Sequence, residues 1–68
     1  MIPSPALDLL ARIVTSPTLL ENLPDREAVS GWPFAYTLGW IQGVELVTIT
    51  DKGRRALVGH MRWLEATK

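Results

Sequence analysis

The fold of this chain is decided by one stretch in its second half, Ile49-Thr50-Asp51-Lys52-Gly53-Arg54-Arg55-Ala56-Leu57. The β-branched residues that lead into it predict a strand over 44–49. Thr50 is a favourable N-cap, and Asp51 places a negative charge in the first turn of the helix that follows. We therefore predict a C-terminal helix over about residues 51–66, with Leu57 as its first buried side chain.

The predicted C-terminal helix has an inner and an outer side. Apolar residues at helical spacing predict an inner stripe of Leu57, Val58, Met61 and Leu64. Arg55 and Arg62 lie seven residues apart on the outer side. Gly53 has no side chain, which allows the start of the helix to lie close to the core.

The N-terminal part of the chain is predicted to be helical. Ser4 and Pro5 are a typical N-cap and first helical residue, and apolar residues at helical spacing extend the helix over 5–15. Asp8 and Arg12 are four residues apart, so we expect them to form an ion pair on the outer side of this helix.

Three further helices are predicted before the strand. Residues 18–23 form a short helix, and a second one begins at Asp25 and is broken by Gly31. A longer helix over 33–42 follows. Gly43 ends it, because glycine readily adopts the left-handed conformation.

Composition limits what the chain can do. It has 68 residues, of which 47% are apolar, and its seven basic and seven acidic residues give a net charge of zero. No internal repeat or linker divides it, so residues 1–68 are expected to form one small domain. A chain this short buries only about 60% of the surface that its unfolded form exposes, so a homodimer or a partner would add stability.

Catalytic and metal-binding chemistry is not expected. The chain has no cysteine, which excludes disulfides and thiolate ligands, and His60 is its only histidine. The serines are placed as caps or turn residues rather than as nucleophiles beside a histidine and an acid. We therefore expect a protein that is not an enzyme and that binds no cofactor or metal ion.

Residues 28–44 carry no charge and, at 17 residues, reach the lower limit of a membrane-spanning length. Three glycines, Pro33 and several polar side chains interrupt this stretch, so membrane insertion is not expected. The N-terminus has neither the basic region nor the long apolar region of a signal peptide. We expect a cytoplasmic protein.

The stretch 49–57 is similar to the passage from the last wing strand into the next helix of winged helix-turn-helix transcription regulators. In that family the strand ends in Leu/Ile-Thr, and an acidic or polar residue, a Lys, a Gly and basic residues follow. The helices on either side of Gly31 also resemble the helix-turn-helix pair. The resemblance implies a mainly helical, winged-helix-like core. Because only residues 44–48 follow the glycine exit, we expect one short strand over 44–49 in place of the family's wing hairpin.

The resemblance also implies a function, that of a small DNA-binding transcriptional regulator. The helix over 33–42 would enter the major groove, and the basic residues after the strand would contact phosphates. The residues expected to contact DNA are Tyr36, Thr37, Gln42, Lys52, Arg54, Arg55 and Arg62. The chain lacks the net positive charge that is typical of DNA-binding domains.

A non-enzymatic protein-interaction module is the alternative function. Pro33, Tyr36 and Trp40 recur along the predicted helix and would form an uncharged aromatic face, of the kind that anchors protein partners. A phage- or prophage-type modulator of a host protein would fit that description. The same rings would also serve to fill the core of so small a domain. The match at 49–57 favours DNA, the uncharged helix favours a protein partner, and both hypotheses stay open.

Overall fold

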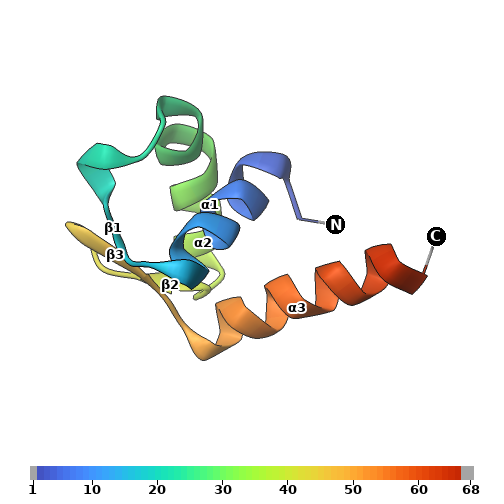
Figure 1. Ribbon diagram of the computed structural model, residues 1–68. Helices are drawn as coiled ribbons and strands as arrows, with labels where there is room; N and C mark the ends of the chain where they lie inside the picture. The colour runs from blue at the N-terminus through green and yellow to red at the C-terminus, as the bar shows by residue number, and fades with distance from the viewer. Residues whose placement is uncertain (1, 67–68) are drawn as a thin grey trace.

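The computed structural model describes residues 2–66, with side chains as far as Trp63 (Figure 1). Its elements, in chain order, are α1 (Ser4–Thr15), β1 (Thr18–Leu19), the 3₁₀ turn η1 (Leu20–Asn22), the π-helical turn η2 (Glu27–Gly31), α2 (Trp32–Thr37), β2 (Ile41–Gln42), β3 (Leu46–Ile49) and α3 (Asp51–Ala66). The fold is mainly helical with a small three-stranded antiparallel sheet, so the expected mainly helical class is confirmed.

Helix α1 packs against η2, α2, β3 and α3. Its inward face buries Ala6, Leu9, Leu10 and Ile13, which recur at helical spacing. The rest of the core consists of Leu23, Ala35, Ile41, Val47 and Leu57. The helix predicted over 5–15 is thereby confirmed, although Ser4 lies inside it rather than at its cap.

Residues 25–37 form one continuous helical run, in which η2 leads directly into α2. Its start at Asp25 agrees with the sequence, but the predicted break at Gly31 is wrong. Gly31 instead allows the run to cross α1 closely, since a Cβ there would lie 2.6 Å from the carbonyl oxygen of Pro5. Packing, rather than helix termination, requires this glycine.

Helix α2 ends earlier than the sequence predicts. Gly39 adopts the left-handed conformation, with a φ of 74°. Its N–H donates to the carbonyl of Tyr36 (3.0 Å), and the N–H of Trp40 donates to the carbonyl of Ala35 (2.9 Å). This pair of bonds is a Schellman motif, which satisfies the last carbonyls of a helix. The helix is therefore closed four residues before the glycine that the sequence favours as its end.

The residues that follow the end of α2 form a β-hairpin instead of continuing the helix. Strand β2 pairs antiparallel with β3, so that Ile41 lies opposite Ile49, and Gly43 (φ 95°) lies in the turn between the two strands. The strand predicted over 44–49 is confirmed as β3, but the prediction that it is the only strand is wrong. Its physical basis, a helix over 33–42 that would leave no room for a second strand, is removed by the early end of α2.

Strand β1 completes the sheet in the order β1-β3-β2, with Thr18 paired to Val47. The helix predicted over 18–23 is wrong, because only Leu20–Asn22 form a helical turn, of the 3₁₀ type. Two residues of strand are too few to show an alternating pattern. Pairing with the distant strand β3, whose Val47 is fully buried, holds them in the sheet.

Helix α3 begins and ends as predicted, at Asp51 and Ala66. The hydroxyl of Thr50 accepts a hydrogen bond from the N–H of Gly53 (3.1 Å) and donates one to the carbonyl of Gly39 (2.7 Å). The N-cap therefore also ties α3 to the end of α2. A side chain at Gly53 would collide with the carbonyl of Trp40, so the predicted close approach of this glycine is confirmed.

Beyond its second turn, α3 extends away from the sheet along one side of the molecule (Figure 1). Leu57 is buried as predicted, but Val58 and Met61 are 47% and 55% exposed. The predicted inner stripe is therefore wrong for these two residues, which no described element covers. Leu64 lies outside the described side chains.

Candidate nucleic-acid and partner surfaces

Helix α3 carries an exposed arginine cluster formed by Arg54, Arg55 and Arg62. Together with Val58 and Gly59, these residues line an open depression, because residues three, four and seven apart share one side of a helix. Among the described side chains, neither Arg54 nor Arg55 lies within ion-pair distance of a carboxylate. Their guanidinium groups are therefore accessible to an external anion such as a phosphate.

Lys52 does not line this depression. It is exposed in the first turn of α3, and its aliphatic stem passes 3.9 Å from the point where a Cβ of Gly39 would lie. The structure therefore places Lys52 beside the end of α2 and outside the depression that the arginines line.

The three neutral residues expected to contact bases do not share one helix. Tyr36 and Thr37 are exposed in the last turn of α2, whereas Gln42 is exposed on β2. The hydroxyl of Thr37 donates to the carbonyl of Pro33 (2.8 Å), and the ring of Tyr36 stacks on Trp32 with centroids 4.7 Å apart. The prediction that one helix carries all three is wrong, because the helix ends before Gln42.

The aromatic face expected from Pro33, Tyr36 and Trp40 is also divided. Trp40 lies beyond the end of α2 and packs edge-on against Phe34, with ring centroids 5.7 Å apart. Tyr36 packs with Trp32, on the opposite side of the helix. The prediction of one continuous face is therefore wrong, because the helical spacing stops short of Trp40.

A groove of about 620 Å³, which the sequence does not reveal, lies between α3 and the end of α2. Its lining consists of Ile2 from the N-terminus, Phe34, Leu38 and Trp40 from α2 and its exit, and Ala56, His60 and Trp63 from α3. We call it the aromatic groove. The spacing i, i+4, i+7 of its three α3 residues is present in the sequence, but the apolar stripe that begins at Leu57 is the stronger pattern there.

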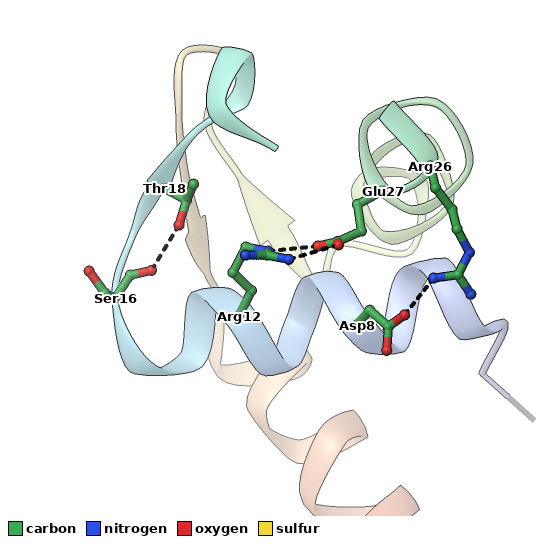
Figure 2. Close-up of polar contacts among 6 residues, drawn as sticks. All are labelled: Asp8, Arg12, Ser16, Thr18, Arg26 and Glu27. Atoms are coloured by element: carbon green, nitrogen blue, oxygen red, sulfur yellow. Dashed lines mark hydrogen bonds and ion pairs between the residues drawn. The ribbon is translucent and has the colours of Figure 1, made fainter. Parts of the chain in front are cut away.

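Two ion pairs join α1 to the helical run of residues 25–37 (Figure 2). Arg12 donates two hydrogen bonds to the carboxylate of Glu27 (2.9 and 3.0 Å), and Arg26 donates one to Asp8 (2.6 Å). The predicted pair between Asp8 and Arg12 is wrong, since each has its partner on the facing element. The hydrogen bond and the charge of Glu27 raise the pKa of Arg12 above its ordinary value. Among the described residues, unengaged positive charge is therefore concentrated on α3.

Two other classes of site are absent from the described residues, 2–66. Among the described side chains, no three His, Asp or Glu residues gather as metal ligands would, and His60 lies in the wall of the aromatic groove. None of the helices in the same range has both the length and the apolar composition needed to cross a bilayer.

The arginine cluster and the aromatic groove are thus the two surfaces from which a function can be inferred. The arginine cluster lies on α3, which also forms one wall of the aromatic groove, and the two surfaces face different sides of this helix. Protein-family models, curated proteins and solved structures were each compared with this chain, and none of them matches it.

Proposed function

We propose that this protein is a small DNA-binding regulator of the helix-turn-helix type, which holds duplex DNA through the arginine cluster. The observation that carries the proposal is the exposure of Arg54 and Arg55 without a carboxylate partner among the described side chains. Guanidinium groups in this setting form bidentate, charge-assisted hydrogen bonds with phosphate oxygens. Such contacts supply essentially all of the affinity of non-specific DNA binding.

The order of the elements supports the winged-helix resemblance. Helix, strand, helix, strand, strand and helix follow one another, with the continuous helical run of residues 25–37 in the place of the family's helix-turn-helix pair, and the β2–β3 hairpin leads into the stretch 49–57. The family has its wing hairpin at the same place in the chain. Here the hairpin turn, residues 43–45, includes Glu45 and carries no basic residue, so the phosphate contacts are assigned to α3.

Sequence readout is expected to be weak. The exposed end of α2 offers Tyr36 and Thr37, and neither side chain makes the bidentate contacts to guanine or adenine that Arg, Asn and Gln provide. The affinity is therefore expected to come from phosphates, and any preference among duplexes from the shape of the DNA.

The proposal is tested by titrating labelled mixed-sequence duplex DNA and following its anisotropy at about 0.02 M and 0.15 M salt. Arg55→Ala and Arg26→Ala form a matched pair, because each removes one positive charge but Arg26 is ion-paired with Asp8. We expect Arg55→Ala to weaken binding several-fold and to reduce the slope of log K against log salt by about one, since each phosphate contact contributes about −0.9.

Arg26→Ala is expected to leave both the affinity and the slope unchanged in a protein whose fold is verified by circular dichroism. Equal effects of the two substitutions would show that net charge, and not the arginine cluster, governs binding. The absence of binding at the lower salt concentration would also contradict the proposal.

A further inference from the structure

The aromatic groove leaves large apolar side chains partly exposed to water. Phe34 and Leu38 are each 37% exposed, and Trp63 is 52% exposed. In a chain of 68 residues, large apolar side chains are needed to fill the core. A contiguous apolar surface that is left outside the core marks an interaction site.

We infer that the aromatic groove is the docking site for an amphipathic helix of a protein partner, with apolar anchors on one face and acidic residues beside them. This inference goes beyond DNA binding and does not depend on it. On α3, Ala56, His60 and Trp63 extend over two turns, or about 10 Å. That length suits the i, i+4 and i+7 anchors that a helix presents to a groove.

Charge complementarity indicates that the partner is acidic. Among the described residues that line the groove, none is acidic. By sequence the same helix carries four basic residues, Lys52 and the arginine cluster, against two acidic ones, Asp51 and Glu65. Asp8 on α1 and Glu27 on the facing helical run are each neutralised by an arginine. Lys52 lies one turn before Ala56 of the groove wall, and the arginine cluster lies across a helix about 10–12 Å wide, so the groove lies in a positive potential, which attracts acidic segments and repels basic ones.

A second copy of this chain fits the groove less well. Two copies that docked groove to groove would bring their α3 helices together, and the excess positive charge of both helices would oppose association, although the arginine clusters face away from the groove. By sequence, Asp51 and Glu65 balance only two of the four basic residues on each helix. A partner that supplies its own acidic side chains avoids this repulsion.

The test begins with a displayed library of helical peptides of about 15 residues, in which the anchor and flanking positions are randomised. Selection on the full chain is expected to enrich large apolar residues at i, i+4 and i+7, with Asp or Glu beside them. The affinity of a selected peptide is then compared with that of the same peptide carrying Lys at its acidic positions. We expect the Lys peptide to bind about ten-fold more weakly. A selection without enrichment, or equal affinities of the two peptides, would overturn the inference.

Two variants that introduce the same charge separate this site from the DNA surface. Ala56→Glu places a carboxylate in the groove wall, and Val58→Glu places one in the depression of the arginine cluster. Neither position is fully buried, so both variants are expected to fold, as circular dichroism would verify.

We expect each variant to weaken one kind of binding and to leave the other nearly unchanged. At about 0.15 M salt, where a charge on one side of α3 is hardly felt on the other, Ala56→Glu weakens binding of the selected peptide by about ten-fold and leaves DNA affinity within about two-fold, whereas Val58→Glu does the reverse. Peptide binding that survives Ala56→Glu rejects the docking site even if DNA binding is found. If the parent protein does not bind DNA, the proposed function is rejected but the docking site is not. A dimer in sedimentation that Ala56→Glu dissociates assigns the groove to a second copy and overturns the inference.

Discussion

Gly31 and Gly59 are both helical, yet their surroundings give them opposite energetic roles. A Cβ at Gly31 would lie 2.6 Å from the carbonyl oxygen of Pro5 and 2.9 Å from its carbon, both backbone atoms of α1. Around Gly59 no atom lies within 4 Å of such a Cβ. Gly31 therefore allows two helices to pack closely. Gly59 gives the unfolded chain more conformational entropy than an alanine would, and that entropy is lost on folding.

Gly31→Ala is expected to lower the free energy of unfolding by about 1–2 kcal/mol, because overpacking against a backbone outweighs the gain in helix propensity. Gly59→Ala is expected to raise it by about 0.5–1 kcal/mol. Urea denaturation of the two variants and the parent measures both changes. An equal rise in stability for the two substitutions would show that α1 does not constrain Gly31.

The residues that the sequence could assign correctly are those whose role is local. Thr50 and Asp51 act within one helical turn, and both have the positions at the start of α3 that their order predicts. Gly31 could not be assigned in this way, because its constraint comes from Pro5, which is 26 residues away in the chain.

At the scale of elements, α1 and the helical run of residues 25–37 are joined by two ion pairs of different exposure. In the pair of Arg12 and Glu27, the carboxylate side chain is only 6% exposed. In the pair of Arg26 and Asp8, the side chains are 56% and 51% exposed. Water and salt screen the second pair far more than the first.

Double-mutant cycles with alanine are therefore expected to give the larger coupling free energy for Arg12 and Glu27. The exposed pair of Asp8 and Arg26 is expected to contribute about 0–1 kcal/mol. The coupling free energy of Asp8 and Arg26 is expected to vanish at about 0.5 M salt, whereas the coupling free energy of Arg12 and Glu27 is expected to persist. Denaturation of the six variants at low and high salt measures both cycles. A coupling for Asp8 and Arg26 that equals the other would refute this ranking.

Elements that depend on distant pairing were the ones that the sequence could not predict. Strand β1 has two residues and exists through β3, which begins 27 residues after Leu19. Two glycines, Gly39 and Gly43, were both suitable as the end of α2, and apolar residues continue between them. The pairing of β2 with β3 favours the earlier one, since Ile41 is buried in the sheet.

At the scale of the whole molecule, α3 holds two surfaces of different origin. The arginine cluster depends on helical spacing alone, so the sequence could place its residues together. The aromatic groove also needs the exit of α2 to lie against α3, a contact fixed by the hydrogen bond between Thr50 and Gly39. Spacing within one helix cannot reveal a site that two elements form.

Because both surfaces lie on one helix, occupancy of one is expected to change the affinity of the other. A helix with its side chains is about 10–12 Å across, which is close to the Debye length of about 10 Å at 0.1 M salt. An acidic peptide in the aromatic groove would therefore reduce the positive potential at the arginine cluster. We expect it to weaken DNA binding several-fold at about 0.02 M salt and hardly at all at about 0.15 M salt.

The measurement is DNA anisotropy with and without a saturating amount of the selected peptide, at both salt concentrations. A peptide with the same apolar anchors but Gln in place of Glu and Asp occupies the groove without the charge, and it is expected to leave DNA affinity unchanged. Thermodynamic linkage requires that DNA weaken the acidic peptide by the same factor. If the Gln peptide is as effective as the acidic one, the two surfaces compete by steric overlap, and the separation of the groove from the arginine cluster is refuted.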